Sequence, residues 1–400
     1  MNKPKIRFKG FEGEWKKVKI GDVAPLTGGF AFQSGQFKTS GVPIIRISNI
    51  LSSGIVGGDF VYYNEFKGDS EFRLYKGDVV IAMSGATTGK VATFEANDFG
   101  YQNQRVGKFS RTNLVNYELL SKLVSAPNFQ KKIISKLTSS AQPNASSKDI
   151  DSIDLVVPEE TEEQRALASY FTSLDAQIAA STSRLSSLKQ IKAASLLNMF
   201  PQKGETVPRV RFKGFQGEWV RQRLGDISAS FSGGTPAVSV SDYYGGNIPF
   251  IRSGEIHEDR TQLYITQAGL NNSSAKIVEK GTILYALYGA TSGDVGISKL
   301  RGAINQAILA IEPTKDIDKF FLAGFLQSYK NRIINELLQG GQGNLSGSLV
   351  KKILLAIPSL PEQRAIASYF TALDAQITLH RERLEKLKQI KAACLEKMFA

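Results

Sequence analysis

The 400-residue sequence has one cysteine and two histidines, so it is poor in side chains that bind metals. Cys394 alone can form neither an internal disulfide nor a CxxC metal site, and with His257 and His380 it makes no zinc site. Its place in an apolar helical pattern favours a buried structural role. No apolar run is long enough to span a bilayer. The first seven residues have no apolar stretch behind their positive charges, which indicates no secretory signal and predicts a cytoplasmic protein without membrane association.

Motifs of enzymes that act on DNA are also missing. The sequence has no Pro-Pro and no Pro-Cys pair, which excludes the catalytic loops of adenine and cytosine methyltransferases. The string closest to a phosphate loop, GATTGKV at residues 85–91, has one residue too few between its glycines and valine where a magnesium-binding hydroxyl belongs. The sequence therefore predicts a non-catalytic chain that holds no cofactor and no metal.

Positive charge is what the sequence has in excess. There are 50 Lys and Arg against 37 Asp and Glu, a formal net charge of +13. Residues 1–150 carry 21 basic against 12 acidic side chains, whereas residues 204–350 carry 15 against 13. Such an excess favours a polyanionic partner, above all nucleic acid, and a basic surface that only keeps the protein in solution is the alternative.

An internal repeat decides the architecture. RFKGFEGEW at residues 7–15 returns as RFKGFQGEW at 211–219, and SGATTG at 84–89 returns as YGATSG at 288–293. Residues 163–200 return as 362–399 with 26 of 38 positions identical. The stretches between these motifs differ, for example 60–71 against 257–269. One scaffold has been duplicated while its surface chemistry diverged, as a protein that recognises two different targets requires.

The two most similar segments predict long helices. Residues 163–200 and 362–399 contain no Gly or Pro and are rich in good helix formers, so each should extend about 57 Å at 1.5 Å per residue. Apolar residues follow one another at alternating steps of four and three, the heptad pattern that packs one helix on another. A helix that packs only on its own domain is the alternative. The predicted helix–helix seam consists of Leu167, Phe171, Leu174, Ile178, Leu185, Leu188, Ile366, Phe370, Leu373, Ile377, Leu384 and Leu387.

The segments outside these helices are typical of α+β domains. Short apolar runs at 79–83 and 282–287 follow a Lys-Gly pair and precede a Gly-containing loop, as buried strands do, while 117–137 and 317–338 have helical patterns. The residues predict an α+β fold with two pseudo-symmetric domains separated by two long coiled-coil helices. The predicted segments are domain 1 (1–158), long helix 1 (159–200), a connector (201–208), domain 2 (209–358) and long helix 2 (359–400).

Sequence recognition needs polar side chains at base edges and basic groups at phosphates. The duplicated loops after the buried strands supply such groups, although their shared glycines and asparagines could equally be determinants of the fold. Candidates in the first copy are Gln33, Ser34, Lys38, Arg46, Ser48, Asn49, Ser84, Gly85, Thr87, Thr88, Lys90, Asn103, Gln104, Arg105, Gln142 and Asn144. Candidates in the second copy are Arg252, Ser253, Glu255, Tyr288, Gly289, Thr291, Ser292, Asn305, Gln306, Gln342 and Asn344.

Taken in order, these motifs resemble the specificity subunits of type I restriction-modification systems. The resemblance covers nearly the whole chain and includes the Gln-x-Asn-x-Ser stretches and the Glu-Gln-Arg helix starts at 163 and 362. It implies that each domain recognises one half of a split asymmetric site in double-stranded DNA. It also implies that the two domains are target-recognition domains and that the two long helices are antiparallel spacer helices. These helices would set the spacer and dock two methyltransferase subunits, through which motor-nuclease restriction subunits join. S-adenosylmethionine, ATP and magnesium would belong to those partners.

Two other function classes are compatible with the sequence. One is a stand-alone tandem DNA-binding regulatory protein without a methyltransferase partner. The other is an interaction scaffold that never contacts DNA. The absence of salt-dependent DNA binding would support this alternative. Copurification with a methyltransferase separates the first of these from a specificity subunit.

Overall fold

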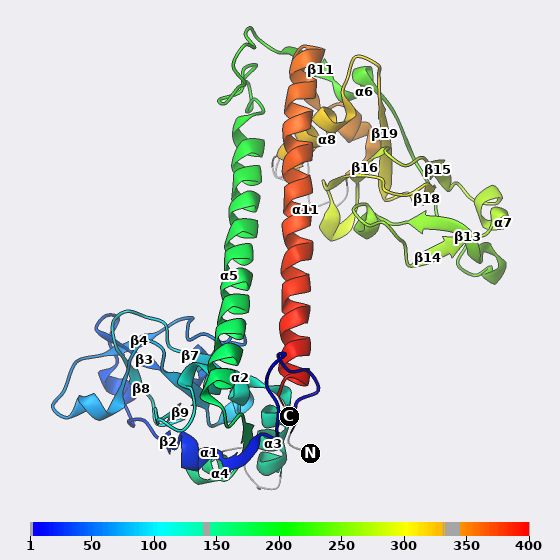
Figure 1. Cartoon of the computed structure of the whole chain (residues 1–400). Coiled ribbons are helices and arrows are strands. Elements are labelled where there is room, and N and C mark those ends of the chain that lie inside the picture. The colour runs from blue at the N-terminus through cyan, green and yellow to red at the C-terminus, as the bar shows by residue number, and fades with distance from the viewer. Residues whose placement is uncertain (1–2, 139–144, 331, 333–344, 400) are drawn as a thin grey trace. The chain divides into compact units, whose positions relative to one another are not determined.

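The computed structural model describes residues 3–138, 145–330, 332 and 345–399, and the chain forms two compact units (Figure 1). Unit 1 comprises Met1–Thr182 and Glu382–Ala400, and unit 2 comprises Ser183–Arg381. Both long helices belong to both units. Helix α5 (Thr161–Asn198) begins in unit 1 and ends in unit 2, whereas α11 (Leu360–Lys397) begins in unit 2 and ends in unit 1.

The two helices form where the sequence predicts them. Each is one uninterrupted helix of 38 residues. The single proline, Pro361, lies in the first turn of α11, where its missing N–H leaves no hydrogen bond unmade. None of the helices within the described residues combines the length and hydropathy that a membrane crossing requires.

Contacts within each unit show that α5 and α11 pack on each other. In unit 1 the Asp175 carboxylate lies 2.6 Å from the Lys391 ammonium, and the Tyr170 hydroxyl lies 3.4 Å from the Cys394 sulfur. Unit 2 has the equivalent pairs, Lys192 with Asp374 at 2.6 Å and Ser195 with Tyr369 at 2.8 Å. In both units the partner number falls as the α5 number rises, so the helices are antiparallel. The predicted fold class is confirmed, and packing of each helix only on its own domain is excluded.

The apolar seam positions of both helices are shielded from solvent. Ten of the twelve predicted seam residues are buried, while Ile178 and Leu387 are half-buried. Some of them also pack into the domains, since Leu167 and Phe171 belong to the core of unit 1, and Ile366 and Phe370 to that of unit 2. Cys394, expected to be buried, is half-buried beside Tyr170.

The two units repeat one strand order in three sheets. Unit 1 has the pair β1-β10, the sheet β2-β9-β6-β7 and the sheet β4-β3-β8-β5; unit 2 has β11-β20, β12-β19-β16-β17 and β14-β13-β18-β15. Pairing is antiparallel except for β3 with β8 and β13 with β18, which are parallel.

The elements of unit 1 before α5 have the following bounds: β1 (Lys16–Lys19), α1 (Ile20–Val23), β2 (Leu26–Thr27), β3 (Val42–Ile45), β4 (Val61–Tyr63), β5 (Arg73–Leu74), β6 (Val79–Ala82), β7 (Val91–Thr93), β8 (Gly100–Gln102), β9 (Val106–Phe109), α2 (Tyr117–Ser125), α3 (Pro127–Thr138), α4 (Ser147–Asp151) and β10 (Asp154–Val157). Strand β6 is buried at all four positions, which agrees with the predicted buried strand at 79–83.

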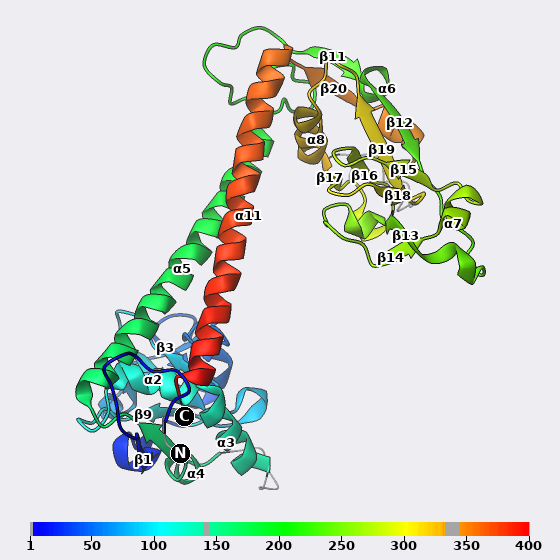
Figure 2. The same cartoon turned by 45° about the vertical axis from the view of Figure 1, so that its right-hand side comes forward.

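The corresponding elements of unit 2 are β11 (Val220–Arg223), α6 (Leu224–Ile227), β12 (Ser228–Ser232), β13 (Tyr244–Ile251), β14 (Leu263–Ile265), α7 (Gln267–Asn271), β15 (Lys276–Val278), β16 (Ile283–Ala286), β17 (Val295–Ile297), β18 (Gly302–Ile304), β19 (Ile308–Pro313), α8 (Lys319–Ser328), α10 (Gly347–Lys351) and β20 (Leu354–Ile357). Helix α8 packs against β17 and β19 (Figure 2).

The helix expected over 117–137 is two helices. Pro127 disfavours the helical conformation at the residue before it, and Ala126 accordingly has φ −66° and ψ 144°, so α2 ends at Ser125 and α3 begins at Pro127. The helix expected over 317–338 begins with Asp318 as its N-cap and is described as α8 to Ser328.

The core of each domain is completed by the end of the long helix that begins in the other unit. Met398 and Phe399, after the last turns of α11, are buried in the core of unit 1, where the Phe399 ring stacks on Phe171 at 5.3 Å. Phe200, after α5, is fully buried in unit 2 and stacks on Phe325 at 4.9 Å.

Asp175 joins three helices of unit 1, because its carboxylate bonds the ammonium groups of Lys122 on α2 and Lys391 on α11. Burial raises the pKa of Asp175, but the two lysines outweigh burial and leave the pKa below its usual value. A carboxyl whose folded pKa is lowered adds stability above its unfolded pKa of about 4 and loses it as the pH falls through the folded value.

We therefore expect Asp175→Asn to lower the free energy of unfolding by about 1 kcal/mol at pH 7, a modest value because part of the side chain is in water. The loss should fade as the pH falls below about 4, because this carboxyl takes up a proton first in the unfolded chain and only at lower pH in the folded protein. Calorimetry at pH 7 and again well below about pH 4 measures the loss of stability. Asp374→Asn is the matched control, because Lys192 is the one basic partner of the Asp374 carboxylate within the described part of the chain. An Asp175→Asn effect no larger than that of the control would contradict the prediction.

Candidate nucleic-acid interface

Three candidate loops of unit 1 begin at neighbouring strand ends and are held together by hydrogen bonds. The loop after β3 begins at Arg46 and the loop after β8 at Asn103, whose N–H donates to the Ile45 carbonyl at 3.1 Å. The Thr87 hydroxyl, in the loop after β6, donates to the Ile47 carbonyl at 3.3 Å. The Met83 N–H donates to the Arg105 carbonyl at 3.0 Å. Segments 46–49, 84–90 and 103–105 therefore form one surface, called loop cluster 1 below.

Unit 2 contains the same arrangement. Strands β13 and β18 are parallel neighbours with Ile251 opposite Ile304, so the loops that begin at Arg252 and Asn305 start side by side. The Leu287 N–H donates to the Ala307 carbonyl at 2.8 Å, which brings the loop after β16 to the same place. Segments 252–255, 288–294 and 305–306 are loop cluster 2. The sequence identified these segments singly, and the fold brings them together.

The shared glycines of the GAT loops are determinants of a tight turn. Gly85 and Gly289 have φ of +74° and +76°, a conformation that side chains disfavour. The Gly89 N–H donates to the Ala82 carbonyl, so each loop closes the hairpin between a buried strand and the next strand. Ser84 and Ser292 are buried. The Thr88 hydroxyl bonds the Gly85 carbonyl at 2.6 Å, and the Thr291 hydroxyl bonds that of Tyr288 at 3.4 Å.

The two Asn-Gln pairs divide their roles. The Asn103 side-chain oxygen accepts from the Arg105 N–H at 3.2 Å, and that of Asn305 accepts from the Ala307 N–H at 3.1 Å, so both asparagines shape their turns. Gln104 and Gln306 are exposed beside them. The glutamines are thus the members of each pair that are better placed to contact a ligand.

The other candidates differ in accessibility. Gln33, Ser34, Lys38, Ser48 and Arg105 are exposed, whereas Lys90, Ser253 and Tyr288 are half-buried. Asn49 is only 1% exposed. Its amide bonds the Arg46 N–H and the carbonyls of Gly57 and Asp59, so the structure assigns it a structural role instead of direct contact with a ligand. Gln142, Asn144, Gln342 and Asn344 lie outside the described residues.

Arg46 and Arg252 follow equivalent strands but differ in their partners. The Arg252 guanidinium bonds both carboxylate oxygens of Glu255, at 3.2 and 3.1 Å, and the Gln262 side-chain oxygen at 2.8 Å. Burial raises the pKa of Glu255, yet the bonds from Arg252 and from the Gln262 N–H outweigh it and hold the pKa below its usual value. Arg46 is half-buried, and its Nε is among the buried atoms without a hydrogen-bond partner within the described residues.

The opening motif of each copy has a role that sequence analysis did not assign. The Arg7 guanidinium bonds both oxygens of the Glu163 carboxylate at 2.7 Å, and Arg211 bonds Glu362 in the same way. The Trp15 indole N–H also donates to Glu163, at 3.2 Å. Both carboxylates are almost completely buried. The motif therefore fastens the segment before each domain to the start of a long helix, and the exact repetition of Arg, Trp and Glu was its signal.

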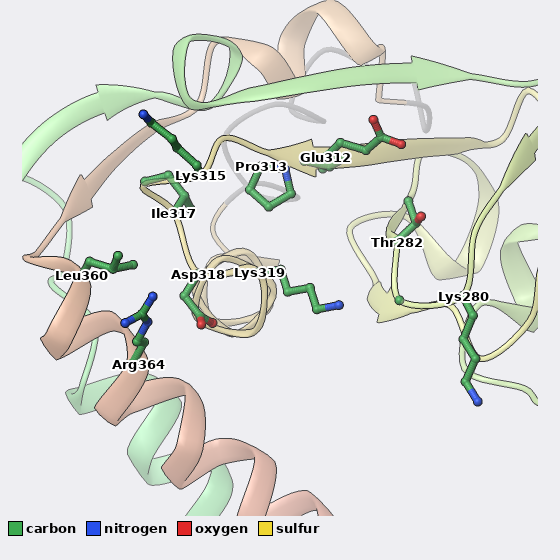
Figure 3. A pocket seen from close by; sticks show the side chains of 12 residues that line it. Lys280, Thr282, Glu312, Pro313, Lys315, Ile317, Asp318, Lys319, Leu360 and Arg364 are labelled. Atoms are coloured by element: carbon green, nitrogen blue, oxygen red, sulfur yellow. The ribbon is translucent and has the colours of Figure 1, made fainter.

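Unit 2 has a cavity of about 410 Å³. It lies where the start of β16 and the end of β19 meet the first turns of α8 and α11 (Figure 3). Four of its side chains are basic and two are acidic, and the Asp318 carboxylate is already used to cap α8 through the N–H groups of Phe320 and Phe321. The charged lining residues are Lys280, Glu312, Lys315, Asp318, Lys319 and Arg364. Among the residues that the structure describes, no group of three or more His, Cys, Asp or Glu side chains is arranged to hold a metal ion.

The repeated scaffold and the unlike loop clusters define a protein with two related recognition domains. Comparison with known families identifies the class: the family described as "Type I restriction modification DNA specificity domain" matches residues 12–190 and again 216–389. The chain belongs to this family, and it is a type I restriction-modification specificity subunit with two DNA-recognition domains. The predicted resemblance and the predicted non-catalytic role in DNA recognition are confirmed.

Individual relatives agree with the family match. The chain is 24% identical over 396 residues to the putative type I restriction enzyme MjaX specificity subunit of Methanocaldococcus jannaschii, covering 94% of this chain and 91% of the relative. It is 28% identical over 151 residues to the HindI specificity subunit of Haemophilus influenzae, covering 35% and 32%. The crystal structure of the type I S subunit from M. genitalium has the same fold, with a TM-score of 0.68 at 16% identity over 100% of this chain and 99% of that one.

Proposed function

We propose that each recognition domain contacts one half of a bipartite, asymmetric site in double-stranded DNA through its loop cluster. The observation that carries the proposal is that one framework, repeated in strand order and hydrogen bonds, presents different side chains at the same strand ends. Gln104 and Arg105 are exposed in one copy, whereas in the other Gln306 is exposed and Arg252 is neutralised by Glu255. Polar groups on rigid strand ends are suited to base-edge recognition.

We further propose that α5 and α11 set the number of unread base pairs between the half-sites. Each helix is continuous and each contributes to both units, so the pair is the only secondary structure among the described residues that is shared by both. Two half-sites linked by a stiff spacer fix a register on DNA, as dimeric DNA-binding proteins do.

The same helices are proposed to dock two methyltransferase subunits. Their related sequences, identical at 26 of 38 positions, and the equivalent pairs Asp175–Lys391 and Lys192–Asp374 give two similar surfaces, which suits two copies of one partner. Restriction subunits would join through that complex, and methyl transfer and ATP-driven cleavage would belong to the partners. A solved structure concerned with complex assembly of the type I R-M system has the same fold as this chain, with a TM-score of 0.55 at 18% identity over 95% of this chain and 96% of that one.

Exchange of residues 1–150 for those of another family member tests the division of labour. We expect one half-site of the methylated DNA sequence to change, while the other half-site and the spacer stay the same, because only one loop cluster has been replaced. Methylome sequencing of cells that carry the variant and its methyltransferase measures this. The reciprocal control exchanges residues 204–350 and should change the other half-site. Simultaneous change of both half-sites would contradict the proposal, and purification without any methyltransferase would favour a stand-alone regulator.

A further inference from the structure

We infer that Arg46 is a specificity-determining residue of the first domain, where its guanidinium recognises a guanine, and that its counterpart Arg252 is not. The inference rests on the proposed DNA contact of the loop clusters and assigns one ligand group to one of them. Arginine pairing with guanine O6 and N7 is the commonest specific contact in the major groove.

The two arginines have the same backbone setting. Arg46 follows β3 with φ −106° and ψ 169°, and Arg252 follows β13 with φ −103° and ψ 162°. In each copy the residue three positions later accepts a hydrogen bond from the arginine N–H: Asn49 at 3.0 Å and Glu255 at 3.2 Å. The difference between the copies is therefore confined to the side chains.

The side chain at the third position decides whether the guanidinium is neutralised. Glu255, with 12% of its side chain exposed, lies along Arg252 and bonds it through both oxygens. Asn49 carries no charge, and its amide nitrogen is already used by the Gly57 and Asp59 carbonyls at 3.1 and 2.9 Å. The second domain thus holds a closed ion pair where the first holds an arginine without a carboxylate partner among the described residues.

Leaving a charged donor without an acceptor costs free energy, because its water has been removed and not replaced. The Nε of Arg46 is in this condition, at the point where the loops of cluster 1 meet. The next residue, Ile47, accepts the hydrogen bond from Thr87, and Asn103 is hydrogen-bonded to Ile45. The exposed residues Gln104 and Arg105 follow Asn103 in the chain. Arg46 as a whole is only half-buried, so part of its side chain is open to a partner beside these other polar groups, and a guanine edge presents a pair of acceptors for a guanidinium.

Arg46→Lys is the decisive variant, because it keeps the charge and removes the planar fork. The full chain is purified with its methyltransferase partner, and binding is measured on duplexes of the methylated sequence found in cells. We expect binding to weaken about tenfold to a hundredfold, with relaxed preference at one G·C pair of the first half-site. A duplex with 7-deazaguanine at that position, which lacks N7, should weaken wild-type binding more than binding by the variant. Arg111→Lys is the matched control, because Arg111 pairs with Asp78 outside loop cluster 1, and it should leave binding and half-site preference unchanged.

Several outcomes would overturn the inference. Equal loss on all duplexes with a smaller salt slope would make Arg46 a phosphate contact. Wild-type binding by Arg46→Lys, or a change confined to the second half-site, would remove its role in recognition. Thermal unfolding of the variant is measured alongside, and Arg46→Gln repeats the test if the lysine variant is unstable. A wild-type complex without sequence-specific, salt-dependent binding would instead refute the proposed function itself.

Discussion

Replacing Glu163 by alanine is expected to lower the free energy of unfolding of unit 1 by about 3–5 kcal/mol, the usual cost of breaking a buried ion pair from one side. The Glu163 side chain is 1% exposed and accepts hydrogen bonds from Arg7 and from the Trp15 indole. Its loss leaves the Trp15 indole N–H without this acceptor and leaves the Arg7 guanidinium with only the carbonyls of Glu12 and Gly13. It also frees the segment before β1 from the start of α5.

The measurement can be made specific to one unit, because the chain has two tryptophans, Trp15 in unit 1 and Trp219 in unit 2. In a Trp219→Phe background, fluorescence during denaturant titration reports on the surroundings of Trp15. Glu162→Ala is the matched control: Glu162 is exposed and pairs with Arg165 at 3.5 Å on the surface, so its loss should cost under about 1 kcal/mol. Equal effects of the two substitutions would show that the buried pair contributes little.

Lengthening both long helices by seven residues is expected to change the spacer of the recognised DNA and not its half-sites. Seven residues add about 10 Å, the length of about three base pairs, and preserve the heptad phase of the seam. The insertions belong after Thr182 in α5 and after Arg381 in α11, where the two units divide. Methylome sequencing should then show up to about three additional unread base pairs.

The control for this experiment lengthens the chain without lengthening a helix. A seven-residue insertion in the connector at 201–208 should leave the spacer as it is in the wild type, because the connector lies after the end of α5. Altered half-sites with unchanged spacing in the double-insertion variant would refute the spacer role of the helices.

The long helices and the duplication were predictable because their signals are local and periodic. Good helix formers, heptad spacing and the absence of internal glycine act within a few turns, and both segments form helices as expected. The break at Pro127 shows the limit of a periodic pattern, since one residue with a fixed φ divides a continuous apolar face into α2 and α3.

The candidate site was harder to predict because shared residues carry two kinds of role. Gly85 and Asn103 attract attention as repeated polar or flexible positions, yet the structure uses them to shape turns. The contrast between Arg46 and Arg252 depends on Asn49, whose amide bonds carbonyl groups eight and ten residues further along the chain. Such bonds exist only after the loop has folded, so no spacing rule reveals them.

The placement of Met398 and Phe399 in the core of unit 1 has a consequence for biosynthesis. Residues 1–182 leave the ribosome early. Met398 and Phe399, which complete the core of these residues, are made about two hundred residues later, after nearly all of unit 2. The first domain is therefore started first and finished last. Until then its apolar face opposite Phe171 lacks a cover, a condition in which nascent chains depend on chaperones and aggregate when these are scarce.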